Sequence, residues 1–351
     1  MTKVRWAVLG TSFISDEACK AIQASSTGEL VAIGNHSNNR IAKFQAQYPD
    51  IKIYAPIDAT DTTSLQRLMD DSDIDAVYIG SPNVVHKELI LQCLAAGKHV
   101  LCEKPFVLTS EEMIEVSQAC QQKSSLVCME ALMNLYHPFT QWFKQIISEE
   151  IGAIETFEAR YTCNIEPFAN RVLGGAIRNL GCYPVSLVRF ILGCEPTEVI
   201  AQPGEIGTDN NIRKATLALT FPHNITATIF AADDEPKNSD DAASFFKITG
   251  KEGEIEVLTN PWLPGKENQI ICRKKNGESK TLNFNAQKLL YSYEIDAVGE
   301  AIIARNSPQS SRAYLHTLPV SLEFSAGNVS VLEVWEKNTR ACHRQSPSYG
   351  K

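Results

Sequence analysis

Short apolar runs alternate with helical patterns through the first third of the chain. Such alternation is typical of β-α-β units and predicts an α/β domain with an open, doubly wound parallel sheet. We predict strands at Val4 to Leu9, Leu30 to Gly34, Ile51 to Tyr54, Ala76 to Ile79, His99 to Cys102 and Leu126 to Met129. We predict helices at Ser15 to Ala24, Arg40 to Gln47, Thr63 to Met69, Val85 to Ala96 and Ser110 to Gln122.

The pattern changes after about residue 130, where neighbouring strands are joined by short Gly, Asn and Pro turns. This indicates an α+β domain with a large, mostly antiparallel sheet. Its predicted strands are Ile154 to Cys163, Lys214 to Phe221, Ile225 to Ala231, Phe245 to Thr249, Glu254 to Leu258, Gln269 to Cys272 and Thr281 to Phe284. Its predicted helices are Pro138 to Ile147, Gly174 to Leu192, Tyr293 to Ala304 and Leu322 to Lys337.

Length and composition agree with two globular domains, which we predict at residues 1–129 and 130–351. A chain of 351 residues exceeds the size at which single cores stop growing. The formal net charge of −8, with no basic stripe, argues against binding to nucleic acid. The N-terminus lacks the pattern of a signal peptide, and no apolar run is long enough to span a bilayer, so we expect a cytoplasmic protein.

Cysteine and histidine patterns do not indicate a metal. The ten cysteines are scattered, and no pair has zinc-site or redox spacing, so we expect buried, reduced thiols. His99 lies inside a predicted strand and is expected in the core. No cluster of His, Cys, Asp and Glu has metal-ligand spacing.

The turn after the first strand resembles a degenerate glycine-rich dinucleotide fingerprint. Gly10 would make the tight turn, while the small Ser12 and Ser15 would replace the later glycines. The candidate cofactor-binding residues of this turn are Gly10, Thr11, Ser12, Phe13 and Ile14. The alternative is a strand-to-helix turn that binds no nucleotide.

The end of the second strand bears on the choice of cofactor. An NAD enzyme usually places an acidic residue there to bind the ribose 2′-hydroxyl. Here no carboxylate is present, and His36, Ser37 and Arg40 could bind a 2′-phosphate. NADP(H) is therefore favoured over NAD(H), although Ser37 could also serve as a helix cap.

The stretch from Tyr78 to Pro105 carries the candidate chemistry of the first domain. Pro82 and Asn83 break the fourth strand at its carboxyl end, where open α/β sheets bind ligands. Lys104 and Pro105 end the fifth strand at the same edge. The charge of Lys104 could lower the pKa of a nearby phenol, or its ammonium could donate to a substrate oxygen. The alternative is a solvated lysine beside a turn proline.

This stretch resembles the glucose-fructose oxidoreductase and inositol dehydrogenase family (Gfo/Idh/MocA). The resemblance also covers Met129 to Pro138 (MEALMNLYHP) and Gly174 to Pro184 (GGAIRNLGCYP), which are most similar to the dimeric dihydrodiol dehydrogenase and sugar-ketoreductase branch. It implies a Rossmann domain that binds the nicotinamide near Lys104. The implied cofactor contacts include Ser81, Pro82, Asn83, His86 and Glu103. The alternative for His86 is a capping or packing role.

The resemblance also implies two substrate-site residues in the second domain. Asn179 and Tyr183 occupy the positions of the family's Asp and His or Tyr, and a spacing of four places them on one helical face. Tyr183 resembles the proton donor, tuned by Lys104. Asn179 cannot exchange a proton, so we assign it to substrate binding only.

Further candidates lie near these motifs. Glu130, at the end of the sixth strand, is assigned to substrate binding, with a structural carboxylate as the alternative. Asn170 and Arg171 could line the pocket or lie in a solvated loop. Leu135 replaces an Arg that related sequences often carry, so an anionic substrate is disfavoured.

These observations predict reversible hydride transfer between NADP(H) and a hydroxyl or carbonyl carbon of a sugar-like or other small polyhydroxy compound. The alternatives are a non-catalytic cofactor-binding sensor and a glycosidase that uses a bound nicotinamide. A homodimer is the family expectation. We predict that the open face of the second sheet pairs the two subunits through the alternating residues Thr216, Ala218, Thr220, Thr226 and Thr228.

Overall fold

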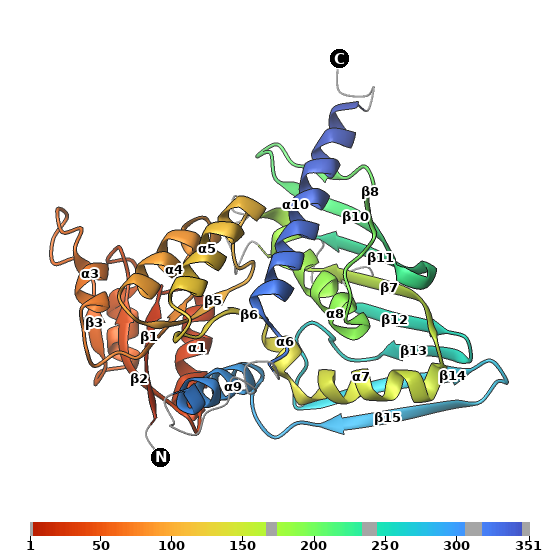
Figure 1. The fold of residues 1–351 in the computed structure, drawn as a ribbon, viewed down its shortest axis with the longest axis horizontal. Coiled ribbons are helices and arrows are strands. Elements are labelled where there is room, and N and C mark those ends of the chain that lie inside the picture. Colours follow the sequence, from red (N-terminus) through yellow and green to blue (C-terminus); the bar gives the residue numbers. More distant parts are fainter. Residues whose placement is uncertain (1–2, 166–173, 234–243, 306–317, 346–351) are drawn as a thin grey trace. The chain divides into compact units, whose positions relative to one another are not determined.

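A computed structural model describes residues 3–165, 174–233, 244–305 and 318–345. The chain forms two compact units (Figure 1). The first unit contains Met1–Met133 and Tyr291–Ala326, and the second contains Asn134–Leu290 and Gly327–Lys351. The segment Tyr291–Ala326 thus joins the N-terminal unit, whereas we predicted that all residues after 129 belong to one domain.

The first unit contains a six-stranded parallel sheet with the strand order β3-β2-β1-β4-β5-β6. This confirms the predicted doubly wound α/β fold. The strands are β1 (Val4–Leu9), β2 (Gly28–Gly34), β3 (Lys52–Tyr54), β4 (Ala76–Ile79), β5 (His99–Glu103) and β6 (Cys128–Ala131). The helices are α1 (Phe13–Ala24), α2 (Ile41–Gln47), α3 (Ser64–Met69), α4 (His86–Ala95), which follows the short 3-10 turn η1 (Asn83–Val85), and α5 (Ser110–Gln122).

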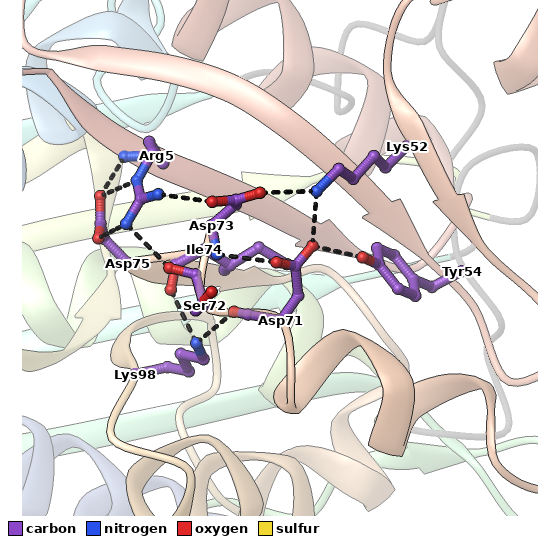
Figure 2. Close-up of polar contacts among 9 residues, drawn as sticks. All are labelled: Arg5, Lys52, Tyr54, Asp71, Ser72, Asp73, Ile74, Asp75 and Lys98. Atoms are coloured by element: carbon purple, nitrogen blue, oxygen red, sulfur yellow. Dashed lines mark hydrogen bonds and ion pairs between the residues drawn. The ribbon is translucent and has the colours of Figure 1, made fainter.

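Polar side chains tie this sheet together at the edge where its strands begin (Figure 2). The side chain of Arg5 in β1 donates two hydrogen bonds to Asp75, from Nη2 to Oδ1 at 2.7 Å and from Nε to Oδ2 at 3.0 Å. Lys98 donates to the carbonyl oxygens of Asp71 at 2.7 Å and Ile74 at 2.8 Å. Charged groups at this edge are therefore engaged with one another, and ligands of open α/β sheets bind at the opposite edge, where the strands end.

Helix α9 (Leu290–Arg305) packs the C-terminal segment Tyr291–Ala326 into the first unit. Asp296 accepts a hydrogen bond from Ser25 Oγ at 2.6 Å in the loop before β2. Gly299 lies so close to Thr27 that a Cβ atom there would be 2.2 Å from the Thr27 hydroxyl oxygen. These contacts join residues about 270 positions apart in the sequence, which explains why local patterns did not predict them.

The second unit is built on a nine-stranded sheet. Its main order is β15-β14-β13-β12-β7-β11-β10-β8, and β9 pairs with β10. Only β7 and β11 pair in parallel among the described strands of this sheet, so the prediction of a mostly antiparallel sheet is confirmed. The strands are β7 (Ile154–Thr162), β8 (Glu198–Ala201), β9 (Glu205–Ile206), β10 (Ile212–Phe221), β11 (Ile225–Ala232), β12 (Phe245–Gly250), β13 (Gly253–Val257), β14 (Glu267–Lys274) and β15 (Ser279–Asn285).

Helices cover part of this sheet. Helix α7 (Pro138–Ile151) packs against β13 and β14, and α8 (Cys182–Leu192) packs against β7 and β11. The remaining helical segments are α6 (Met133–Tyr136), the π-helical turn η3 (Ile177–Gly181), the 3-10 turn η4 (Pro222–Asn224) and α10 (Leu322–Gln345). The sequence patterns did not predict α6, β8 or β9, which have at most four residues each.

Burial alternates along the paired strands β10 and β11. Leu217, Leu219 and Ile229 are buried. Thr216, Ala218 and Thr220 on the other face of β10 are half-buried, and Thr226 and Thr228 on β11 are exposed. The predicted alternation is therefore present in this unit.

None of the ten cysteines forms a disulfide bond, and seven of them are buried. His99 is buried, and its Nδ1 accepts a hydrogen bond from Val127 N at 2.8 Å, which confirms its core position. Within the described ranges, no group of His, Cys, Asp and Glu is arranged to hold a metal ion. No described helix is both long and apolar enough to cross a membrane.

Candidate active site

The turn between β1 and α1 lies in close contact with Gly80, the residue that follows β4. Gly10 has φ +109°, and a Cβ atom there would lie 2.8 Å from the carbonyl oxygen of Gly80. Ser12 is the N-cap of α1 and forms a capping box with Ser15. The Ser12 hydroxyl also donates to Gly80 O at 3.2 Å. A glycine is therefore required at position 10, and the two serines fix the start of the helix.

The predicted turn residues are distributed around this helix start. Thr11 is buried, Ile14 is half-buried, and Phe13 is 54% exposed at the first position of α1. The sequence predicted that Ser12 and Ser15 would act only as small residues. The structure shows that Ser15 also fills the space next to Gly80, where a Cβ atom would lie 2.7 Å from Ser15 Oγ.

Asn35 holds the loop after β2 in place. Its Nδ2 donates to Thr11 Oγ1 at 2.8 Å, and Thr11 Oγ1 donates to Asn39 O at 2.8 Å. The sequence pattern distinguishes this position only by the absence of a carboxylate and does not predict its contact with Thr11. The fixed loop places Arg40, with φ 59°, at the N-cap of α2.

His36 and Arg40 have exposed side chains in this loop, and Ser37 is half-buried. Neither His36 nor Arg40 forms an ion pair with an acidic side chain in the described part of the chain. An anionic ligand could therefore approach both side chains without displacing an acidic partner.

His86 connects the loops that follow β4 and β5. Its Nδ1 lies 3.0 Å from Pro105 O, and its Nε2 lies 2.9 Å from Ser81 O. Burial lowers the pKa of this imidazole, which favours the neutral ring. A neutral ring has one N–H, so it donates to one of the two carbonyl oxygens at a time. His86, at the start of α4, thus holds these two loops together inside the fold.

Two further predicted residues precede His86 in the chain. Pro82 is exposed and Asn83 is half-buried at the start of η1. They follow Gly80 and Ser81 directly, so they lie at the carboxyl end of β4, the edge predicted from the sequence.

The buried side chain of Glu103 stabilises the turn at Lys104. Tyr78 OH donates a hydrogen bond to Glu103 Oε1, and Lys104 N donates to Glu103 Oε2 at 3.1 Å. Burial raises the pKa of Glu103, although the Lys104 charge and the Tyr78 hydrogen bond act in the opposite direction. The role of Tyr78 was not predicted, although its hydroxyl is the one polar side-chain group in the apolar strand AVYI.

Glu130 stabilises the other side of the same turn. This buried carboxylate at the end of β6 accepts a hydrogen bond from Phe106 N at 3.0 Å, directly after the cis Lys104–Pro105 bond. The contact corresponds to the structural alternative for Glu130. Together, Glu103, His86 and Glu130 hold the backbone of residues 103–106, and the half-buried Lys104 side chain begins at this fixed point.

In the second unit, Asn179 lies in the π-helical turn η3 and Tyr183 lies in the first turn of α8. Asn179 is half-buried, and its Nδ2 donates to Gly175 O at 3.0 Å. A Cβ atom on Gly181 would lie 2.5 Å from the Trp335 ring, so a larger residue would displace this turn. The π turn is held further by Arg178, whose Nε lies 2.7 Å from Glu336 Oε2.

Tyr183 is buried among aromatic rings. It contacts Tyr161 edge-on, with ring centroids 5.6 Å apart, and Tyr161 stacks with Trp262 at 5.9 Å. Burial raises the pKa of Tyr161. The sequence patterns did not predict this cluster, because the three residues lie on separate elements. Leu135 is also fully buried, so this position provides no charge for an anionic ligand.

Asn170 and Arg171 lie outside the described residues. The remaining candidates fall into two groups, one at the carboxyl edge of the first sheet and one at the junction of η3 and α8.

Comparisons with known proteins agree with this division. A family model described as "Oxidoreductase family, NAD-binding Rossmann fold" matches residues 4–131, and one described as "GFO/IDH/MocA C-terminal domain" matches residues 140–256. D-xylose 1-dehydrogenase (NADP(+)) of Hypocrea jecorina is 27% identical over 80% of this chain and 78% of its own length. Trans-1,2-dihydrobenzene-1,2-diol dehydrogenase of Xenopus laevis is 28% identical over 88% of this chain and 93% of its own.

A solved structure shares the whole fold. A 3-ketoreductase from Actinomadura kijaniata, in complex with NADP and TDP-benzene, gives a TM-score of 0.81 at 21% identity. The likeness covers 96% of this chain and 98% of that one. The parallel sheet, its glycine turn and the matches to both halves of the chain lead to one assignment. The protein belongs to the GFO/IDH/MocA family and is an NAD(P)-dependent oxidoreductase.

Proposed function

We propose that this protein catalyses reversible hydride transfer between NADP(H) and a hydroxyl or carbonyl carbon of a sugar-like or other small polyhydroxy compound. The observation that carries the proposal is the turn at Lys104, whose backbone is held by hydrogen bonds to Glu103, His86 and Glu130. This turn places a lysine at the edge of the sheet where ligands of open α/β sheets bind. The names of the relatives, a xylose dehydrogenase and a dihydrodiol dehydrogenase, support the substrate class.

The residues at the first sheet edge fit a dinucleotide. The Gly10 turn leads into the capped N-terminus of α1, where a pyrophosphate would meet backbone N–H groups and the positive end of the helix dipole. We assign this contact to Gly10, Thr11, Ser12, Phe13 and Ile14. Bound NADPH would supply the hydride.

For proton transfer to and from the substrate, we assign the acid-base chemistry to Tyr183 and Lys104. In the reducing direction, the Tyr183 hydroxyl donates its proton to the carbonyl oxygen of the substrate as negative charge develops there. The Lys104 ammonium stabilises that charge electrostatically. Asn179 orients a substrate hydroxyl or carbonyl through its amide. We retain Glu130 and Arg171 as candidate substrate contacts.

Cofactor choice is tested by replacing Arg40 with alanine. We propose that His36, Ser37 and Arg40 bind the 2′-phosphate of NADP(H). A hydrogen bond to a charged group contributes about 1.5–3 kcal/mol, so Arg40→Ala should weaken NADPH binding by about tenfold or more and leave NADH binding nearly unchanged. The measurement is titration of both cofactors. Lys43→Ala, another exposed cation on α2, is the matched control. Equal wild-type affinities for the two cofactors would contradict this assignment.

The reaction class is tested by a substrate screen. Purified protein with NADPH is offered aldoses, ketoses, dicarbonyls and deoxysugar ketones, and NADPH oxidation is followed by absorbance. We expect oxidation with at least one sugar-like carbonyl compound.

We further propose that the open face of β10 and β11 pairs two copies of the chain. A measurement of the molar mass of the protein in solution tests this proposal.

A further inference from the structure

Helix α10 contacts the π-helical turn η3 at two neighbouring points. Glu336 on α10 accepts a hydrogen bond from Arg178 in η3, with 2.7 Å between Glu336 Oε2 and Arg178 Nε. Trp335, the preceding residue on α10, lies against Gly181 at the end of η3, where a Cβ atom would be 2.5 Å from the Trp335 ring. All these groups belong to the second unit. Helix α10 thus holds η3 on both sides of Asn179 in the sequence.

The Glu336 carboxylate is itself held in place. Its Oε1 accepts hydrogen bonds from Arg340 Nε at 3.2 Å and Arg340 Nη2 at 3.0 Å. Arg340 Nη1 in turn donates to Asn210 O at 2.9 Å, in the turn before β10. The side chains of Arg178 and Glu336 are 10% and 24% exposed. A partly buried carboxylate that accepts charged hydrogen bonds at both oxygens is a fixed point, and Arg178 is held against it.

The shape of η3 explains why this support matters. A π turn contains more residues per turn than an α-helix, so the same segment wound as a regular α-helix would point Asn179 in another direction relative to Tyr183 on α8. Before η3, the chain is fixed to β10: Gly175 has φ +53°, and a Cβ atom there would lie 2.5 Å from Ile212 O. The contacts with α10 fix the other part of the segment and thereby favour the π form.

We infer that Glu336 is a positioning residue for Asn179: by holding Arg178 against α10, it keeps η3 in its π form and fixes the direction of the Asn179 amide. This inference rests on the proposed role of Asn179 in substrate binding. In this account Glu336 acts on the substrate only through Arg178 and Asn179. Because Asn179 binds the substrate and transfers no proton, a misplaced Asn179 raises KM and leaves kcat nearly unchanged.

The first test needs no substrate. Hydrogen–deuterium exchange, followed by mass spectrometry, measures the local opening of the peptide that covers residues 175–183. Glu336→Ala removes the acceptor of Arg178, so exchange in this peptide should become about fivefold faster or more, as expected when a partly buried ion pair is lost. Exchange in β14 and β15, at the end of the sheet order away from β10, should keep its wild-type rate.

Glu323→Ala is the matched control for this test, because Glu323 is an exposed acidic residue on the same helix. It should leave exchange in residues 175–183 unchanged. Arg178→Met removes the other partner of the ion pair and should reproduce the effect of Glu336→Ala. An unchanged rate for this peptide in Glu336→Ala, or equally faster exchange throughout the second unit, would overturn the inference.

The second test uses the carbonyl substrate that the screen identifies. Glu336→Ala should raise its KM by about three- to tenfold, the size of one lost neutral hydrogen bond, with kcat and NADPH affinity near their wild-type values. In an Asn179→Ala background, the same replacement should raise KM no further, because Glu336 acts through Asn179. Increases in KM that simply add would show a general structural role and overturn the inference.

The two tests separate this inference from the proposed function. Exchange is measured without turnover, so a failed substrate screen would count against the proposed function alone. Unchanged exchange in residues 175–183 would count against the role of Glu336 alone.

Discussion

Replacing Tyr183 with phenylalanine should lower kcat by about 10²- to 10⁴-fold, the range typical of a lost general acid. The ring and its contact with Tyr161 are kept, so the aromatic cluster should remain intact. NADPH affinity should change little, because Tyr183 is not among the residues that we assign to cofactor binding. Steady-state kinetics and cofactor titration together give both quantities.

Tyr161→Phe is the matched control for this prediction. Tyr161 is a second buried phenol and stacks with Trp262 in the same cluster. Removing its hydroxyl should change kcat much less than Tyr183→Phe does. An unchanged rate for Tyr183→Phe would exclude the tyrosine as proton donor.

Replacing Lys104 with methionine should lower kcat by about 10²- to 10³-fold, as expected when one preorganised donor to a developing oxyanion is removed. Methionine has a similar length but no charge. The fold should persist, because the main-chain contacts of residues 103–106 with Glu103, His86 and Glu130 do not involve the lysine side chain.

Lys87→Met provides a control for the loss of a lysine charge elsewhere in the first unit. Lys87 pairs with Glu115 at 3.3 Å between α4 and α5. Its replacement should leave kcat within a factor of a few of wild type. If Lys104→Met turns over as fast as Lys87→Met, the catalytic role of Lys104 is refuted.

Local patterns predicted the bounds of helix α5, whose start has a local chemical cause. Helix α5 begins after Thr109, whose hydroxyl accepts from Glu112 N at 3.1 Å, and its predicted bounds match the structure. Helix α1 begins two residues before the predicted start, because Ser12 caps it. Strand β6 was predicted two residues too early. In the structure, the side chain of His99 takes the N–H of Val127 in place of a strand partner.

Long-range contacts explain what the sequence could not reveal. The assignment of α9 to the first unit depends on Asp296 meeting the loop at Ser25, and no local period indicates such a contact. The same applies to Tyr78, whose hydroxyl donates to Glu103 on another strand. Gly10 was found because it marks the turn after the first strand, whereas His86 and Glu103 were found through the family resemblance.

The proposed reaction differs measurably from its two rivals. A cofactor-binding sensor would bind NADPH without consuming it. A glycosidase that uses a bound nicotinamide would leave the redox state of its cofactor unchanged after each turnover. Only net hydride transfer moves a hydrogen atom from the cofactor to a stable product.

The most direct measurement follows that hydrogen atom. NADPH carrying deuterium at both C4 positions is incubated with the protein and each compound of the carbonyl screen, and the products are analysed by mass spectrometry. The account predicts an alcohol product with one deuterium on the former carbonyl carbon, formed in equal amount to NADP⁺. Bound NADPH with no deuterated product across the whole panel would contradict it.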